Sequence, residues 1–525
     1  MADEKFVLLG PATQFVSHTR FLFTLRCVNR PSLYHSLLLF RLASLSPQEL
    51  PSTCPATEKD ESGLAEDLPG HDSSLHTSNS TINPSSKYGQ MYVMESTCPH
   101  LGADLSHADI EEGPESAVAV CPWHKYDFDL KTGHSDHGIR ACTYAVQLRP
   151  QTREDPSPAA TPSKGGDQIL EVWVEAPSPD AWEVVELRPV SEEFADPPPI
   201  IPTPTTSTAP LEPISDAGAE SQTLPTTLLE WSVLILNTPN PDRKVERTRQ
   251  AIDAFKTGKL RSIGRSGSNA PSPPDVPPRE ADLRVVAPGK VGKRGKAGSL
   301  KSRIVILHAL ANIEQWAIDL AWDIIARFAN VKINGKPLPQ QFFSDWTKVA
   351  QDEAKHFSLL RKRLEELGSS YGEHTVHAGL WESAQETAHS LSARLAIIHL
   401  VHEARGLDVN PATIQKFKTA GDVESVKVLE VIHHDEITHV TAGHRWLSWV
   451  CEQTNEDPVA VFRDHVRRHF SGAIKGPYNI DDRKKAGLTP DFYEDLQGEL
   501  GFGGFVFPPT SGQTAATPVG YEVTP

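Results

Sequence analysis

The sequence predicts a multidomain protein in which an all-β domain is followed by an all-α domain containing a four-helix bundle. Short alternating or apolar stretches fill the first part of the chain, as in a β-rich domain. Four longer segments between residues 304 and 440 carry apolar residues at helical spacing. The expected parts are a β domain at 1–185 with a disordered insertion at about 47–86, a Pro/Thr-rich linker at 186–225, a helical domain at 226–500 and a disordered tail at 501–525.

Length and charge limit the classes of function. The 525 residues include 51 basic and 68 acidic side chains, for a net charge of -17. Such an acidic chain is a poor general binder of nucleic acid or anionic membrane. The sequence shows no stretch as long as a membrane span and no apolar signal core at its start, so we expect a cytoplasmic protein with no membrane partner. Six cysteines in a chain of this length do not form a disulfide framework.

The β domain is expected to begin with three strands, at Phe6–Leu9, Phe21–Cys27 and Ser36–Leu42. The insertion that follows is rich in Ser, Thr, Asp and Pro. Within it, two histidines and one aspartate resemble the ligand set of a mononuclear iron site, but in a low-complexity segment we interpret them as a chance pattern. These three residues are Asp67, His71 and His76.

Two short motifs follow the insertion. Cys98 and His100 form a C-x-H motif, and Cys121 and His124 form a C-x-x-H motif about twenty residues later. Each motif places one thiolate and one imidazole in a single tight turn. Two cysteines can hold one iron of a [2Fe-2S] cluster while two histidines hold the other. The same four residues could also hold a zinc ion.

These motifs, with the downstream YDFDLKTGH and LEVWVE, make residues 5 to 185 similar to a Rieske [2Fe-2S] domain. The resemblance implies a cluster bound by the four motif residues and a role in electron transfer. Ala103 and Trp123 occupy the places where high-potential respiratory members have a cysteine pair, so the resemblance is to a soluble Rieske ferredoxin. Lys125 stands where the family usually has Gly, a departure that concerns the geometry of the loop.

The helical domain is expected to start with a helix near Thr227 to Phe255. A basic segment from Lys290 to Arg303 then leads into the first of the four apolar segments. This basic segment is either a solvated approach to the helix or a contact for an anionic substrate or RNA.

Each of the four apolar segments brings a carboxylate to the middle of its hydrophobic face, in the order Glu, Glu-x-x-His, Glu, Glu-x-x-His. The residues are Glu314, Glu353, His356, Glu403, Glu436 and His439. A Glu and a His three residues apart project from one helix face, and this set is the ligand set of ferritin-like di-iron or di-manganese proteins. Four buried carboxylates need cations, which two divalent metals would supply. The alternative is that the acids pair with nearby arginines, namely Arg303, Arg327, Arg394 or Arg405.

From about residue 304 to 500 the sequence resembles an uncharacterised ferritin-like family that is related in fold to a di-iron hydroxylase acting on a modified tRNA base. The phrases that carry this resemblance are LHALANIEQWAIDLAWD, DWTKVAQDEAKHF, YGEHTVHAGLWE, VHEARGLDVNP, HHDEITHVTAGHRW and KGPYNIDDRKKAG. The resemblance implies that the six residues are dimetal ligands. His374 and His377 would line the entrance or lie in a surface loop, and Arg405 and Asp408 would support the ligands or form an ion pair.

Together the two domains predict a self-contained redox enzyme. The resemblances imply that a Rieske cluster feeds electrons to two iron ions, or an Fe/Mn pair, which activate O₂ and hydroxylate a small molecule or a modified nucleoside. A rubrerythrin-like peroxide reductase is one alternative, and a non-enzymatic iron-handling or redox-sensing protein is another. Because the sequence shows no Gly-rich dinucleotide fingerprint, we expect a separate NAD(P)H-dependent reductase as partner. We expect no nucleic acid partner unless the substrate is RNA, and we expect the two domains to be separable at the linker.

Overall fold

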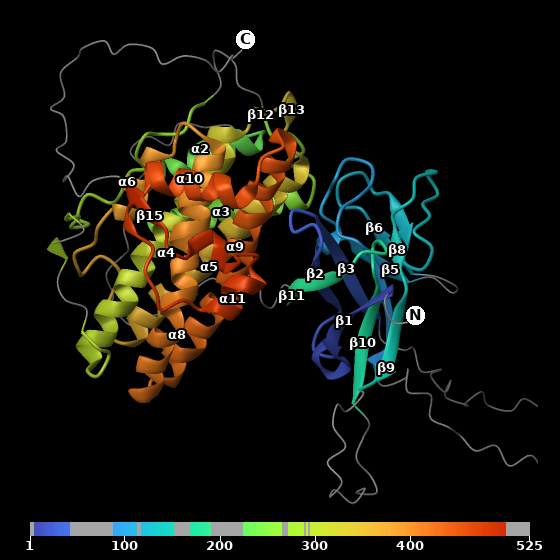
Figure 1. Cartoon of the computed structure of the whole chain (residues 1–525), viewed down its shortest axis with the longest axis horizontal. Coiled ribbons are helices and arrows are strands. Elements are labelled where there is room, and N and C mark those ends of the chain that lie inside the picture. The colour runs from blue at the N-terminus through green and yellow to red at the C-terminus, as the bar shows by residue number, and fades with distance from the viewer. Residues whose placement is uncertain are drawn as a thin grey trace, which may run out of the picture.

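The computed structural model describes residues 5–42, 88–112, 117–151, 169–190, 224–264, 271–287, 290–291 and 295–499. Figure 1 shows a β part on the right and a helical part on the left, with the chain passing once from the first to the second. The predicted order of a β domain followed by a helical domain is therefore confirmed. The predicted insertion with Asp67, His71 and His76, most of the predicted linker and the predicted tail lie outside the described residues.

The described residues of the β part form three antiparallel sheets. The first has the order β1-β10-β9, with strands Phe6–Pro11, Leu170–Glu175 and Val146–Pro150. The second has the order β11-β2-β3-β4-β8, with strands Trp182–Pro189, Arg20–Cys27, Tyr34–Leu42, Gln90–Glu95 and Thr143–Tyr144. The third, β5-β6-β7, has strands Asp109–Glu112, Ala117–Val120 and Asp127–Asp129. The three strands expected at the start of the chain match β1, β2 and β3.

Strand β3 shows how the five-stranded sheet is covered on both faces. Successive side chains of a strand point to opposite faces. Leu37 and Leu39 enter a small core shared with the β1-β10-β9 sheet, whereas Leu38 and Phe40 enter a larger core that continues into the helical part. One face of this sheet therefore supports the β domain itself, and the other contributes to the contact between the two parts.

The predicted start of the linker at residue 186 is wrong. Strand β11 continues to Pro189 and stays paired with β2, with Glu186 opposite Thr24 and Arg188 opposite Leu22. The charged pair Glu186 and Arg188 interrupts the apolar pattern, which is why the sequence indicated a linker there. Both side chains have charged partners in the helical part, described below.

Four long helical stretches form the centre of the helical part. They are α4 (Leu300–Phe328), α5 (Gln340–Glu366), the continuous run of α7 (Leu391–Ala396), the π-helix η5 (Ile397–His402) and α8 (Glu403–Thr419), and finally α9 (Val423–Thr454). Helix α4 packs against α5, α8 packs against α9, and α5 packs against α9. Helix α4 has the length and hydropathy of a membrane span, but 72% of its most apolar window is buried inside the protein. Its apolar composition is explained by its place in this core.

Shorter elements surround these helices. They are α2 (Leu228–Leu236), α3 (Pro241–Lys256), α6 (Gly379–Glu386), α10 (Pro458–His469), α11 (Ile480–Lys485) and α12 (Pro490–Tyr493), with the two-stranded sheets β12-β13 (Lys332–Ile333, Lys336–Pro337) and β14-β15 (Ser471–Ala473, Gln497–Glu499). The single helix expected near Thr227 to Phe255 is divided into α2 and α3. Asn240 caps α3 through a hydrogen bond from the Arg243 amide, and Pro241 is its first residue, a combination that starts a new helix.

The two parts share an extensive contact. Trp123 of the β part donates from Nε1 to the Phe255 carbonyl at the end of α3, at 2.9 Å. Arg26 donates from Nη2 to the Lys484 carbonyl in α11, also at 2.9 Å. One buried apolar cluster contains residues of both parts. The expected separability at the linker assumed few contacts between the domains, and this assumption is wrong, because large buried side chains also connect them.

Candidate metal centres

The first candidate centre lies in two loops of the β part that have the same hydrogen-bonding pattern. In one, the Gly102 amide donates to the Cys98 carbonyl at 2.8 Å; in the other, the Lys125 amide donates to the Cys121 carbonyl at 3.0 Å. Each closes a tight turn around one cysteine and one histidine. Gly102 and Lys125 both have positive φ, at 74° and 59°. The lysine found where a glycine is usual therefore keeps the glycine-like backbone, at a cost of about 1–2 kcal/mol.

The four motif side chains converge. Cys98 and Cys121 are 2% and 0% exposed. The interaction between their thiols lowers the pKa of Cys121 to about 6 and raises that of Cys98 above its usual range. The rings of His100 and His124 lie 4.8 Å apart. The Nδ1 atom of His124 is buried without a hydrogen-bond partner, as expected of an atom that binds a metal.

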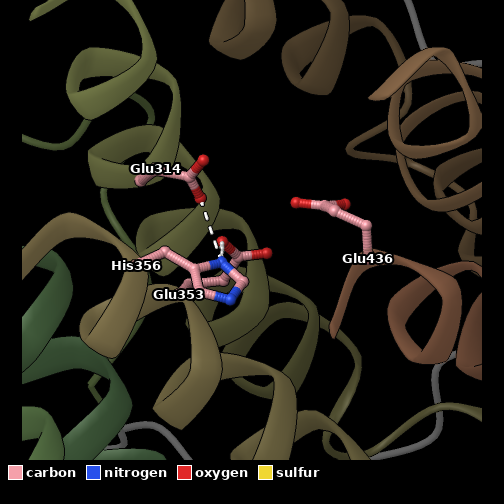
Figure 2. A group of neighbouring side chains, drawn as sticks. All are labelled: Glu314, Glu353, His356 and Glu436. Carbon is pink, nitrogen blue, oxygen red and sulfur yellow. Dashed lines mark ion pairs between the residues drawn. The ribbon is translucent and has the colours of Figure 1, made fainter. Parts of the chain in front are cut away.

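The second candidate centre lies among the four long helical stretches. Glu314 comes from α4, Glu353 and His356 from α5, Glu403 from the first turn of α8, and Glu436 and His439 from α9. The structure brings all six predicted residues together. Glu314, Glu353, His356 and Glu436 form one group of four ligand atoms within 4.8 Å of one another, and Glu353, Glu403, Glu436 and His439 form another. Figure 2 shows the first group, with Glu436 facing the other three side chains.

The two groups overlap at Glu353 and Glu436, so each of these carboxylates faces two possible metal positions. His356 Nδ1 lies 3.3 Å from Glu314 Oε2 and 3.4 Å from Glu353 Oε2. His439 Nδ1 lies 3.0 Å from Glu353 Oε1 and 4.0 Å from Glu436 Oε2. The arrangement offers two neighbouring positions for an ion, each with one imidazole and one carboxylate of its own and two carboxylates in common.

Buried polar atoms without hydrogen-bond partners test whether metals fit here. Such atoms include both carboxylate oxygens of Glu353, Oε2 of Glu436 and Nδ1 of both His356 and His439. Native proteins leave few buried polar atoms unpaired, and here several converge on one point. Carboxylate oxygens and neutral imidazole nitrogens are suitable ligands for iron or manganese. The residues therefore fit a pair of divalent cations.

Without cations, the carboxylates perturb one another. Burial and the neighbouring Glu353 raise the pKa of Glu314 to about 8, and burial and Glu353 raise that of Glu403 to about 7. Burial, followed by Glu403, raises the pKa of Glu436 well above its usual range. Against the effect of its own burial, Glu353 has a lowered pKa because the imidazoles of His439 and His356 face it. In the metal-free protein, protons thus compensate the negative charge that cations would otherwise compensate.

Two aspartates hold the outer nitrogens of the imidazoles in a crosswise arrangement. Asp435 Oδ2 of α9 lies 3.0 Å from His356 Nε2 of α5, and Asp352 Oδ2 of α5 lies 3.4 Å from His439 Nε2 of α9. Lys355 Nζ lies between the two aspartates, 3.2 Å from Asp352 and 2.5 Å from Asp435. These contacts orient each imidazole so that Nδ1 points inward.

The sequence interpretation missed these two aspartates, although a signal for them was present. Both helices carry the same five-residue pattern, Asp-Glu-x-x-His, as DEAKH in α5 and DEITH in α9. Asp352 and Asp435 therefore occupy equivalent places immediately before Glu353 and Glu436. An aspartate repeated at the same place before two Glu-x-x-His motifs indicates a structural partner for the histidines.

A π-helix precedes Glu403, and the sequence did not predict it. Residues Ile397–His402 form this wider turn between α7 and α8. Isolated π-helical turns often occur at functional sites because they redirect the side chains that follow. Gly443 of α9 lies directly against this turn: a Cβ atom on Gly443 would be 2.5 Å from the His399 carbonyl oxygen. The close approach of the two backbones requires glycine at this position.

The alternative of acids paired with arginines applies to other carboxylates. Asp323 pairs with Arg394 and, at 2.7 Å, with Arg327. Asp422 pairs with Arg303 at 2.9 Å. The arginines named as alternative partners therefore have aspartates as partners, which supports a metal interpretation for the glutamates.

Four other candidate residues have contacts outside the two groups of ligand atoms. Asp408 lies 2.8 Å from both Nε and Nη2 of Arg483, and Arg405 is 3.5 Å from the same carboxylate, so the pair belongs to an ion cluster with α11. The ring of His374 packs 5.2 Å from the ring of His308. The His377 carbonyl accepts from Asn312 Nδ2 at 3.1 Å. Among the described residues, the two candidate groups of ligand atoms include none of these four.

A cavity of about 690 Å³ lies between the β part and the helical part. Its walls include Asp352, Lys355 and Asp435 from the helices and Arg188 from β11. None of the six candidate dimetal ligands lines it. The cavity thus reaches the outer side of the histidines but stops at the layer of aspartates and cations.

The fold and its sites define a two-domain redox protein, in which an iron–sulfur domain precedes a helical domain with a carboxylate and imidazole centre. The model of the Rieske [2Fe-2S] domain matches residues 66–144, and this match identifies the first centre as a [2Fe-2S] cluster site with a role in electron transfer. The model described as "Protein of unknown function (DUF455)" matches residues 237–494.

Two relatives support these matches. An uncharacterised protein of Haemophilus influenzae is 38% identical over 205 residues, which are 39% of this chain and 71% of that protein. A Rieske domain-containing protein of Homo sapiens is 42% identical over 45 residues, which are 9% of this chain and 29% of that protein. The chain belongs to the DUF455 family and carries a Rieske domain before its family region.

Proposed function

We propose that this protein is a Rieske-coupled di-iron oxidoreductase with a ferritin-like centre that uses O₂ to hydroxylate a small molecule or a modified nucleoside. The observation that carries the proposal is the overlap of the two ligand groups at Glu353 and Glu436. Two carboxylates shared between two metal positions are typical of di-iron carboxylate sites in helical bundles. A lone structural metal would need only one of the groups.

The residues have distinct roles in this proposal. Glu314 and His356 would hold one iron, Glu403 and His439 the other, and the shared carboxylates would bridge them. The bound iron pair supplies the redox chemistry of O₂, and the [2Fe-2S] cluster supplies electrons one at a time. Asp352 and Asp435 keep each imidazole oriented toward the irons. The core of the bundle excludes water from the centre.

The contact between the domains supports electron transfer within one chain. The cluster loop meets the start of α5, where a Cβ on Gly102 would lie 3.3 Å from the Gln340 side chain. Thirteen residues further along the same helix is Glu353, a separation of about 20 Å at the rise of an α-helix. A separate NAD(P)H-dependent reductase is the proposed source of the electrons, because the sequence carries no dinucleotide fingerprint.

The interdomain cavity has no place in the oxygen chemistry of this proposal. Its walls contain none of the six ligands, and Asp352, Lys355 and Asp435 form the wall that faces the centre. A substrate in this cavity would meet ion-paired side chains and would not reach the irons. We therefore expect the substrate to approach from another face of the bundle.

The first test is metal analysis with a matched pair of variants on α9. The protein as purified should contain about two metals per chain beyond the cluster irons. Glu436→Ala should lose at least one of them, whereas Glu424→Ala, which changes an exposed glutamate on the same helix, should retain both. The EPR signal of the reduced cluster should be the same in both variants.

The second test separates the classes of function. After chemical reduction, O₂ with a cell-derived substrate fraction should reoxidise the cluster in the wild type and far more slowly in Glu436→Ala. Faster reoxidation by H₂O₂ without substrate would favour a peroxide reductase, and loading with many irons per chain would favour iron storage. Unchanged metal content and O₂-driven reoxidation in Glu436→Ala would contradict the proposal. Profiling of metabolites and modified nucleosides in a deletion strain would then identify the substrate.

A further inference from the structure

Strand β11 of the Rieske domain reaches across the interface with two charged side chains. Glu186 and Arg188 are two residues apart, so they project from the same face of the strand. Lys348 and Asp352 are one turn apart on α5, so they also share a face. Glu186 forms an ion pair with Lys348, and Arg188 Nη1 lies 3.0 Å from Asp352 Oδ2. The strand and the helix thus make two ion pairs side by side, each with one partner from each domain.

One of these pairs continues into the candidate dimetal centre. Asp352 Oδ2, which contacts Arg188, is also the atom that lies 3.4 Å from His439 Nε2. The other nitrogen of His439, Nδ1, lies 3.0 Å from Glu353 Oε1. Two steps therefore lead from the Rieske domain strand to a candidate metal ligand. The second ion pair, between Glu186 and Lys348, touches neither Asp352 nor a candidate ligand among the described contacts, although Glu186 also lies 3.4 Å from Arg188 Nε.

Among the groups that contact the two aspartates, Arg188 is the one that the Rieske domain contributes. Asp352 and Asp435 are buried and bring two negative charges. Lys355 supplies one positive charge between them, and Arg188 supplies the second. Without Arg188 in the docked protein, Asp352 would lose one of its two cationic partners and keep only Lys355, which is costly for a buried carboxylate. Lys355 would then be drawn toward Asp352, which would weaken the support that Asp435 gives to His356.

We propose that Arg188 is a positioning residue for the dimetal centre, so that the Rieske domain completes the shell of side chains that holds the metal ligands. This inference rests on the proposed function. It assigns the docked domain a role beyond carrying electrons, because docking fixes Asp352, and Asp352 fixes His439. Arg188 also places a positive charge near the candidate dimetal centre. Removal of that charge favours the oxidised metals, which carry more positive charge, and therefore lowers the reduction potential of the centre.

The experiment compares substitutions in the two neighbouring ion pairs. Arg188→Met removes the contact to Asp352, Arg188→Lys restores the charge with a shorter side chain, and Lys348→Met removes the adjacent ion pair without touching Asp352. Each full-length holoprotein is incubated with a metal chelator, and the metal that remains is measured with time. Loss of a residue that supports a metal ligand typically weakens metal binding about 10- to 100-fold. We expect Arg188→Met to lose metal to the chelator about 10- to 100-fold faster than the wild type. Arg188→Lys should show a smaller increase in this rate, and Lys348→Met should lose metal at the wild-type rate.

Two further measurements separate positioning from a general loss of docking. The EPR spectrum of the Rieske cluster should be unchanged in all variants, and the midpoint potential of the dimetal centre should fall in Arg188→Met alone. Equal metal loss in Lys348→Met and Arg188→Met would mean that docking as a whole, not Arg188, retains the metals, and would overturn the inference. Wild-type retention in Arg188→Met would also overturn it. A wild-type protein without the two metals would instead refute the proposed function itself.

Discussion

The contact between Gly443 and the π-helix gives a quantitative test of how the bundle positions Glu403. A Cβ atom at Gly443 would lie 2.5 Å from the His399 carbonyl oxygen and 3.1 Å from the His399 Cβ. The first contact is to backbone, so no side-chain rotation can relieve it. In Gly443→Ala the π-helix must move away from α9, and Glu403, four residues after His399 on the same helical run, must move with it.

The expected change in stability has two opposing contributions. Alanine favours a helix over glycine by about 1 kcal/mol. Overpacking a well-filled core costs about 1–3 kcal/mol, and contact with a backbone atom places this site at the upper end. Gly443→Ala should therefore destabilise the helical part by about 1–2 kcal/mol. Gly406 of α8 is the matched control, because an added Cβ there would make only ordinary van der Waals contact outside its own helix, at 3.7 Å from Glu436 Oε2. Gly406→Ala should stabilise by up to about 1 kcal/mol.

Thermal unfolding followed by far-UV circular dichroism measures both variants. A change of 1 kcal/mol shifts the Tm of a domain of 150–250 residues by about 2–4 °C, so the two variants should move in opposite directions. Metal analysis adds a second readout: Gly443→Ala should lose the metal held by Glu403 and His439 before the other. If Gly443→Ala is as stable as Gly406→Ala and keeps both metals, the π-helix does not position Glu403 through this contact.

Three further predictions concern the Rieske domain and its interface. His124→Cys should lower the reduction potential of the cluster, because a thiolate adds negative charge, and an EPR-monitored titration showing an equal or higher potential would contradict the ligand assignment. After cleavage within residues 191–223, the two parts should still elute together in gel filtration. In cleaved Trp123→Ala, which loses the buried contact with Phe255, the two parts should separate. Coelution in both cleaved proteins would show that Trp123 is dispensable for docking. Burial and the nearby Arg26 lower the pKa of His444 to about 3. Between that pH and the ordinary histidine pKa of about 6.5, the undocked helical part binds a proton at His444 that the docked protein does not. The stability of docking should therefore be full above a pH of about 6.5 and fall as the pH decreases toward 3. His444→Phe should remove this pH dependence, and the same acid dependence in that variant would assign the effect to another group.

The convergence of the six candidate ligands could be predicted from sequence because their signal is local. Each glutamate lies among apolar residues at helical spacing, a costly place for an acid, and each histidine follows three residues after a glutamate. The four helices needed only to pack in the usual way to bring the six side chains together. The cysteine and histidine motifs of the β part are local in the same sense, because each motif occupies a single turn.

Arg188 and the π-helix could not be predicted, for two physical reasons. The role of Arg188 depends on the docking of two domains, and its own sequence neighbourhood, between a strand and a Pro-rich segment, indicates a linker. The π-helix at Ile397–His402 depends on the fit between two backbones at Gly443, which no apolar periodicity reports. Both features are set by tertiary contacts that override local preference.

Helix α5 combines both functions of the interface because it carries two stripes of residues. One stripe, with members four or eight residues apart, faces the Rieske domain through Gln340, Lys348 and Asp352. The other stripe faces the bundle core through Glu353 and His356. A helix moves as a rigid rod over this length, so a displacement of the Rieske domain that pulls on the first stripe also displaces the second. The contact that brings the cluster loop to α5 and the contact that holds Asp352 are therefore made or lost together. Under the proposed function, this couples the docking of the electron donor to the geometry of the centre that would receive its electrons.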